Sequence, residues 1–195
     1  ALSKVINIRN ETKNKKPIYI VSLKECNQLI KKTIPMMLAK CSFLEHKSSK
    51  NTKESFHLII DEAHNILSET SVREAETWKD YRLELFEEII KEGRKFGFFV
   101  TISSQRPFDI SPTIVSQLHN YFIHRLVNEN DLFLLKNTLS TLDAASRSLI
   151  PTLPPGGCIV SGTAFHTPLL VQIDRLAEGN APNSDTLDLE KLWDI

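Results

Sequence analysis

Short apolar runs alternate with stretches of helical periodicity along most of the chain. Mostly apolar runs over 18–23, 56–60 and 98–102 predict three buried strands, because strands covered on both faces need no polar alternation. Apolar residues recur every three or four positions over 24–46 and 72–92, which predicts two long amphipathic helices. This alternation predicts an α/β fold with a mostly parallel sheet and helices on both of its faces.

The periodicity also predicts the buried face of each long helix. In the first helix, which Pro35 is expected to kink, the expected stripe is Leu29, Ile30, Ile34, Met37, Leu38 and Cys41. In the second helix the stripe is Val72, Ala75, Trp78, Tyr81, Leu85 and Ile89. Ser71 and Glu74 have the spacing of a capping box before that helix, and Gly97 suits its C-terminal stop.

Turn and helix-start signals divide the rest of the chain. Ser111 and Pro112 predict the start of a short helix, with Ser111 as its N-cap. The further expected elements are a strand at 121–126, helices at 128–139 and 142–150, and a C-terminal β-hairpin at 158–173. We expect a single domain at 17–174. A polar lead-in at 1–16 precedes it, and a polar tail at 175–195, with a short helix near 187–193, follows it.

Composition limits the classes of protein to consider. The chain has 195 residues, 41% hydrophobic and 25% charged, as expected for a globular domain with one substantial core. Lysine plus arginine and aspartate plus glutamate both number 24, so a nucleic-acid contact would have to come from a local basic patch. No membrane span or signal peptide is evident, and the three cysteines lack metal-site spacing, so we expect a cytoplasmic protein with reduced thiols.

Two adjacent carboxylates follow the apolar run at 56–60. Asp61 and Glu62 would stand at the C-terminal edge of a parallel strand, where open α/β sheets place their ligands. In nucleoside-triphosphate hydrolases such a pair divides the work, because the first carboxylate holds the Mg²⁺ coordination sphere and the second orients the attacking water. The alternative is a strand-to-helix turn whose acids cap the following segment.

Other polar side chains are candidates for the same chemistry. Gln105 and Arg106 end the next predicted strand at that edge, where the glutamine amide could contact a γ-phosphate or simply close a turn. Arg94, at the end of the second long helix, suits either an arginine finger or a cation at a helix C-terminus. Sequence does not rank Arg94 against Arg106. Three lysines in an expected loop are weak candidates for DNA contact: Lys47, Lys50 and Lys53.

The phosphate-binding loop that normally accompanies such carboxylates is missing from the sequence. None of the six glycines belongs to a G-x-x-x-x-G-K-[ST] motif. The chain begins with Ala1, so we expect it to be part of a longer or processed sequence. We therefore expect this chain not to hydrolyse ATP on its own and the phosphate loop to lie upstream.

Five motifs in order resemble one family of ATPases. They are IIDEAHN, EGRKFG, SSQRP, SPTIVSQLHNYFIHRL and LPPGGCIVSG, and the resemblance as a whole extends over about Tyr19 to Asp174. The series is similar to the C-terminal part of the ATPase domain of the HerA family, hexameric DNA translocases of the HerA/FtsK class. Ser104 departs from the family, which more often has threonine there, although the hydroxyl is kept.

The resemblance implies a partial RecA-like P-loop NTPase core that uses ATP and Mg²⁺. By this resemblance Asp61 and Glu62 match the Walker B pair, Gln105 the sensor glutamine and Arg94 the trans-acting arginine. The implied assembly is a homo-hexameric helicase or translocase on double-stranded DNA. Its implied partners are a nuclease (NurA-like) in DNA repair or an effector enzyme in phage defence, and no membrane is involved.

Three other interpretations stay open. A DEAH-box helicase shares the literal DEAH at 61–64, but it expects Ser-Ala-Thr where this chain has SSQRP. A conjugative ATPase of type IV secretion shares the acidic pair and the sensor glutamine, yet it is less similar through QRP and LPPGG. The third interpretation comes from a different class, a catalytically silent interaction module that keeps an ATPase-like sheet.

Overall fold

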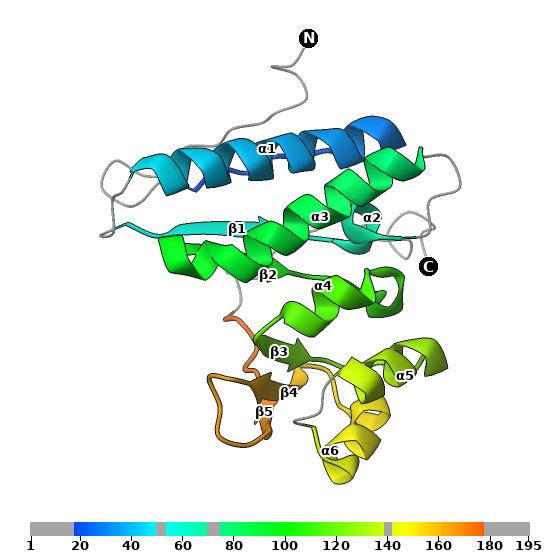
Figure 1. The fold of residues 1–195 in the computed structure, drawn as a ribbon. Helices are drawn as coiled ribbons and strands as arrows, with labels where there is room; N and C mark the ends of the chain where they lie inside the picture. Colours follow the sequence, from blue (N-terminus) through cyan, green and yellow to red (C-terminus); the bar gives the residue numbers. More distant parts are fainter. Residues whose placement is uncertain (1–17, 50–53, 70–74, 139–141, 178–195) are drawn as a thin grey trace, which may run out of the picture. The chain divides into compact units, whose positions relative to one another are not determined.

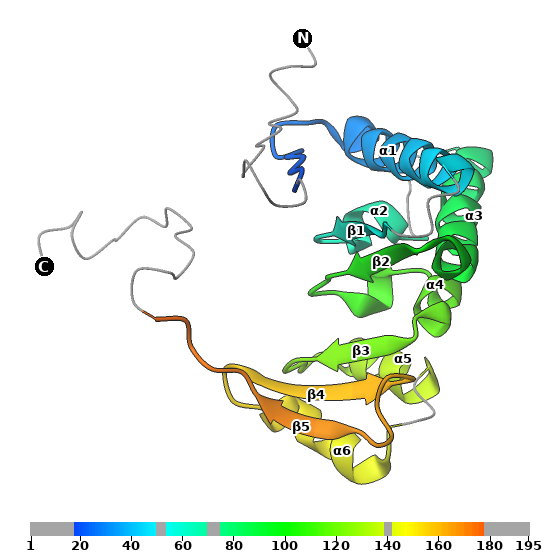
Figure 2. The ribbon, with the colours of Figure 1, turned by 90° about the vertical axis from the view of Figure 1, so that its left-hand side faces the viewer.

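The computed structural model describes residues 18–49, 54–69, 75–138 and 142–177, which form a mixed α/β structure (Figures 1 and 2). They divide into two compact units, each described here by itself. The first contains the described residues up to His119 together with 128–138, and the second contains 120–127 and 142–177. The expected lead-in, most of the tail and its short helix lie outside the described residues.

The first unit is built on two parallel strands, β1 (Phe56–Ile60) and β2 (Phe98–Ile102). They pair in direct register, from Phe56 opposite Phe98 to Ile60 opposite Ile102. Both strands are confirmed within a residue of their predicted bounds. A parallel pair needs a long crossover, and the 37 residues from 61 to 97 supply it through helices α2 (His64–Leu67) and α3 (Glu76–Glu92).

Only one face of this sheet is covered within the described residues. Ile60 and Phe98 are buried on that face, where Phe98 meets the ring of Phe43 edge to face at 5.4 Å. On the other face Ile59 is 71% exposed and Phe99 41% exposed. The prediction of helices on both faces is therefore wrong for the described residues, because no described helix packs over Ile59.

Helix α1 (Gln28–Ser49) lies beside α3 and begins after Asn27, whose Oδ1 accepts a hydrogen bond from the Ile30 amide at 2.9 Å (Figure 1). Pro35 lies inside it, and the helix continues three residues beyond its predicted end. Its buried side chains are Met36, Ala39 and Phe43. The predicted stripe is wrong: Leu29, Ile30, Met37, Leu38 and Cys41 are exposed, and Ile34 is half-buried.

The strand predicted at 18–23 is absent from the structure. Ile18, Tyr19 and Ile20 are 66%, 59% and 54% exposed and belong to no helix or strand. A strand is defined by hydrogen bonds to a neighbour, and no described strand pairs with this segment. A β-branched run alone is therefore not enough to form one.

Helix α3 contributes more buried apolar side chains to the core of the first unit than any other described element. The prediction of its buried face is right for Leu85 and Ile89 and wrong for Ala75 and Tyr81, which are exposed. Trp78 is half-buried, and Val72 lies outside the described residues. The expected capping box at 71–74 lies outside the described residues. Arg82, which the sequence did not single out, is completely buried. Its guanidinium donates to the carbonyls of Ile66 and Ser68, so it ties α3 to the end of α2.

Tight turns connect the remaining elements of this unit. The 3-10 helix η2 (Gly93–Phe96) leads from α3 to β2, and Gly97 ends it with φ of 73°, as predicted. After β2 come the 3-10 helix η3 (Pro107–Asp109), α4 (Pro112–Gln117) and α5 (Glu129–Thr138). Ser111 does not cap α4 with its side chain, because its Oγ donates to Glu69 Oε1 at 2.6 Å instead.

The second unit contains an antiparallel sheet in the order β3 (Asn120–Ile123), β4 (Gly157–Gly162) and β5 (Leu169–Gln172). β4 and β5 pair antiparallel, as expected of the hairpin predicted at 158–173. The antiparallel pairing of β3 with β4 departs from the predicted mostly parallel sheet. The unit also holds α6 (Ala144–Leu149), which Asp143 caps, and the 3-10 helix η4 (Ile150–Thr152). Among all described residues, no helix combines the length and the apolar character needed to cross a bilayer.

Candidate active site

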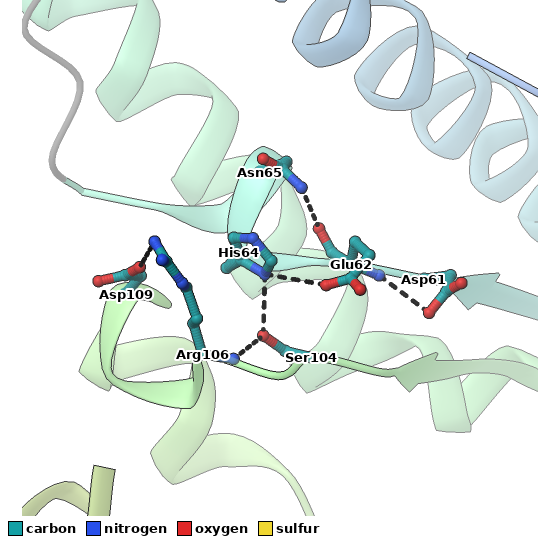
Figure 3. A network of polar contacts seen from close by, with 7 residues as sticks. All are labelled: Asp61, Glu62, His64, Asn65, Ser104, Arg106 and Asp109. Atoms are coloured by element: carbon teal, nitrogen blue, oxygen red, sulfur yellow. Dashed lines mark hydrogen bonds and ion pairs between the residues drawn. The ribbon is translucent and has the colours of Figure 1, made fainter. Parts of the chain in front are cut away.

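The C-terminal ends of β1 and β2 bring the acidic pair and the Gln105 segment to one sheet edge. The pairing continues past the strands, since the Ser103 amide donates to the Ile60 carbonyl and the Ala63 amide to the Ser103 carbonyl, both at 2.9 Å. These bonds hold the turn that carries Asp61 and Glu62 against the start of the Gln105 segment, 103–106. Figure 3 shows the polar contacts at this edge.

Glu62 has a left-handed backbone conformation, with φ of 48°, and is the only non-glycine with positive φ among the described residues. Three hydrogen bonds surround it. Its amide donates to Asp61 Oδ1 at 3.0 Å, and its carbonyl accepts from the amide of Asn65 at 3.0 Å and from Asn65 Nδ2 at 3.2 Å (Figure 3). Strained residues of this kind concentrate at functional sites, because surrounding contacts must hold them in place.

His64 connects the two segments at this edge. Its Nδ1 lies 3.3 Å from Glu62 Oε2 and 3.2 Å from Ser104 Oγ (Figure 3). The imidazole is 18% exposed and the Glu62 side chain 42% exposed, yet the Glu62 oxygen that faces the imidazole is buried. Asp61, in contrast, is exposed. The two carboxylates therefore stand side by side in different environments.

The segment that carries Gln105 and Arg106 has its own anchors. The Arg106 amide donates to Ser104 Oγ at 3.0 Å, and its guanidinium Nη1 lies 3.7 Å from Asp109 Oδ2. Buried Asp131 of α5 accepts a hydrogen bond from the Phe108 amide at 3.0 Å. Gln105 and Arg106 are both exposed, so their side chains are accessible from the same edge as Asp61.

Arg94 is not part of this cluster. It is exposed in η2, which Gly97 joins to the start of β2, whereas Asp61 follows the last residue of β1. Because the two strands are parallel and in register, these positions lie at opposite ends of the sheet. Arg94 and Glu62 of one chain therefore do not share a site.

Lys47 differs from its prediction as a loop residue. It lies in the last turn of α1, with Nζ 3.6 Å from Glu92 Oε2 and 4.9 Å from the centre of the Phe96 ring. Its charge is partnered within the molecule, which makes it a weaker candidate for a phosphate contact. Lys50 and Lys53 lie outside the described residues.

The described residues contain no group of three His, Cys, Asp or Glu side chains placed to hold a metal ion. A Mg²⁺ ion bound through one or two carboxylates, water and substrate phosphates needs no such group. Asp61 is exposed, and its carboxylate is the type of ligand that such an ion takes.

Three residues at the site carried no functional prediction from the sequence. His64 and Asn65 occur in the sequence argument only as letters of the motif IIDEAHN, and Ser104 only as a departure from the family. Their contacts join positions up to 40 residues apart, which local periodicity does not detect. The signal available was the pair of parallel strands, since equivalent positions after two paired strands come close together.

No family model matches the chain. Among curated proteins, it is 32% identical over 154 residues to "DNA double-strand break repair helicase HerA" of Sulfolobus acidocaldarius, covering 76% of this chain and 29% of the relative. The protein of the same name from Sulfurisphaera tokodaii is 34% identical over 66% of this chain and 24% of its own length. The one from Saccharolobus solfataricus is 32% identical, over 72% of this chain and 27% of its own length. The chain thus spans less than a third of these relatives.

Solved structures with a similar fold include the genome packaging NTPase B204 from Sulfolobus turreted icosahedral virus 2. Its complex with AMPPCP has a TM-score of 0.58 at 19% identity and covers 91% of this chain and 72% of that one. Its complex with AMP has a TM-score of 0.56 at 19% identity, covering 87% and 70%. At this identity the likeness concerns the fold alone.

Proposed function

We propose that this chain, which is a region of the HerA class, supplies part of the ATP-hydrolysing site of a DNA translocase. The observation that carries the proposal is the edge of the β1–β2 sheet, where Asp61 and strained Glu62 adjoin the segment with Gln105. Ligands of open α/β sheets bind at this end of the strands. The core that surrounds the site would be RecA-like, with the elements missing here supplied by further sequence.

Each polar residue at the edge has a role in the proposed reaction. Exposed Asp61 holds the water shell of the nucleotide-bound Mg²⁺, while Glu62 orients and polarises the water that attacks the γ-phosphate. Gln105 contacts the γ-phosphate or that water, so that its segment responds to the state of the nucleotide. Arg106, at the same edge, stabilises phosphoryl charge within its own chain.

ATP and Mg²⁺ are the proposed ligands, and the chain lacks the motif that would cradle the phosphates. Since no G-x-x-x-x-G-K-[ST] sequence occurs in its 195 residues, those groups would come from another part of the complete protein. The isolated chain is accordingly expected to be inactive. The proposed assembly is a cytoplasmic homo-hexamer on double-stranded DNA, working with a nuclease or a defence effector.

The test uses the complete protein that contains this chain. Glu62→Gln keeps the shape of the side chain and removes its basicity, so we expect ATP turnover to fall roughly a hundredfold or more while ATP binding is kept. DNA-stimulated phosphate release measures turnover, and a fluorescent ATP analogue measures binding. Glu88→Gln, on the exposed face of α3, is the matched control and should leave both unchanged. Undiminished turnover in Glu62→Gln would reject the proposed role and favour a silent interaction module.

A further inference from the structure

One oxygen of the Glu62 carboxylate is held by a single contact. Glu62 Oε2 is buried and makes no hydrogen bond, apart from its ion-pair contact with His64 Nδ1 at 3.3 Å. A buried polar atom loses its water, so it depends strongly on whichever protein group replaces that water. The direction in which the Glu62 carboxylate points therefore depends on His64.

The same imidazole atom also reaches the neighbouring segment. His64 Nδ1 lies 3.2 Å from Ser104 Oγ, so Glu62 and Ser104 both approach one nitrogen. Nδ1 therefore couples Glu62 to Ser104, whichever of the imidazole and the hydroxyl donates the hydrogen between them. Ser104 Oγ in turn accepts a hydrogen bond from the Arg106 amide at 3.0 Å. The position of the Ser104 hydroxyl therefore depends on the conformation of the segment that contains Gln105.

We propose that His64 is a positioning residue for Glu62, and that through Ser104 it makes the placement of the carboxylate depend on the Gln105 segment. This inference rests on the proposed ATP hydrolysis. A shift of the Gln105 segment on contact with the γ-phosphate moves Ser104. The imidazole, which contacts both side chains, moves with Ser104 and turns the Glu62 carboxylate toward the attacking water.

The experiment measures kcat and KM for ATP in the complete protein with DNA. We expect His64→Ala and Ser104→Ala each to lower kcat roughly ten- to a hundredfold with little change in KM, because a misplaced base affects the chemical step. The double variant is expected to be no worse than the poorer single one, since both changes break one chain of contacts. His64→Asn keeps a donor near the Nδ1 position and Ser104→Thr keeps the hydroxyl, so both should recover most of the loss.

Controls separate this inference from the proposed function. His119→Ala removes an exposed histidine of the same unit and should leave kcat unchanged. A wild-type protein without ATPase activity, or an active Glu62→Gln variant, overturns the proposed function itself. If the wild type is active and Glu62→Gln is not, two results overturn the role of His64. One is equal kcat values for wild type and His64→Ala. The other is a loss of kcat in the double variant that equals the product of the two single losses. Thermal unfolding monitors the fold, and where His64→Ala does not fold, the comparison of Ser104→Ala with Ser104→Thr decides.

Discussion

Glu62 has a backbone conformation that most residues avoid, and the energy of that conformation can be measured. A left-handed conformation costs a residue with a β-carbon roughly 1–2 kcal/mol, and glycine avoids that cost. The hydrogen bonds from Asn65 to the Glu62 carbonyl show what holds the turn in place. The strain places a carboxylate at the sheet edge at the expense of stability.

Replacing Glu62 should therefore reveal this strain in the free energy of unfolding. We expect Glu62→Gly to raise it by up to about 1 kcal/mol, and Glu62→Val to lower it by about 1–2 kcal/mol, because a β-branched residue tolerates positive φ poorly. Urea denaturation measures both values. Glu88→Gly is the matched control, since glycine within helix α3 should lower stability by about 1 kcal/mol. If Glu62→Gly and Glu88→Gly lower the free energy of unfolding by similar amounts, the backbone of Glu62 is not strained.

Arg82 is a charged residue whose role is structural. It is completely buried and donates to the carbonyls of Ile66 and Ser68, at the end of helix α2. Arg82→Met keeps much of the side-chain volume and leaves those carbonyls without their donor, so we expect a loss of about 3 kcal/mol in the free energy of unfolding. Arg94→Met, at an exposed position, should change it by less than about 0.5 kcal/mol. Equal effects of the two substitutions would show that the Arg82 contacts contribute little.

At the scale of elements, prediction succeeded where the local pattern was sufficient. Strands β1 and β2 are mostly apolar runs bounded by turn residues, and both formed as predicted. The run at 18–23 has the same composition, but a strand also needs a neighbour, which its own sequence cannot specify. Helix α1 failed differently, because its apolar residues lie on more than one side and only packing decides that Phe43, and not Met37, is buried.

The junction between α3 and β2 depends on close contact with a glycine. A β-carbon on Gly93 would lie 2.5 Å from the Phe98 carbonyl oxygen, a backbone atom that cannot move without shifting β2. Helix propensity alone predicts that Gly93→Ala stabilises the protein by about 1 kcal/mol. We expect the opposite, a loss of about 1–3 kcal/mol, because the contact overpacks the junction.

Thermal unfolding of Gly93→Ala distinguishes these two expectations by sign. Glu88→Ala, on the exposed face of α3, serves as the control and should stay within about 0.5 kcal/mol of wild type. A more stable Gly93→Ala protein would show that β2 moves away at little cost.

For the whole molecule, the sequence predicted the meeting of two segments at one sheet edge but not the contacts within it. Parallel strands in register place Asp61 and Gln105 at the same end of the sheet, which is a consequence of topology. The contact of His64 with both Glu62 and Ser104 depends on side-chain geometry in a turn with positive φ, and no periodicity specifies that. The exposure of the sheet face around Ile59 likewise depends on which elements pack against that face, and the sequence of the strand does not specify this.

The two arginines lie at opposite ends of the β1–β2 sheet, so mixed assemblies can separate their roles. Arg106 lies at the same edge as Glu62, whereas Arg94 precedes β2 at the other end. We expect Arg94→Ala and Glu62→Gln each to inactivate a pure assembly of the complete protein. A mixture should regain activity, because a subunit with intact Glu62 can receive Arg94 from its neighbour. With random 1:1 mixing in a ring, about a quarter of the interfaces are complete.

The same mixture made with Arg106→Ala should stay inactive, because a residue that acts within its own chain cannot be supplied by a neighbour. Phosphate release at several mixing ratios measures the recovery. The control mixes Arg94→Ala with a double variant, Glu62→Gln and Arg94→Ala, in which no intact Arg94 remains and no recovery is possible. Recovery with Arg106→Ala but not with Arg94→Ala would reverse the assignment. Absence of recovery in every mixture would mean that neither arginine crosses a subunit boundary, whatever role each has in its own chain.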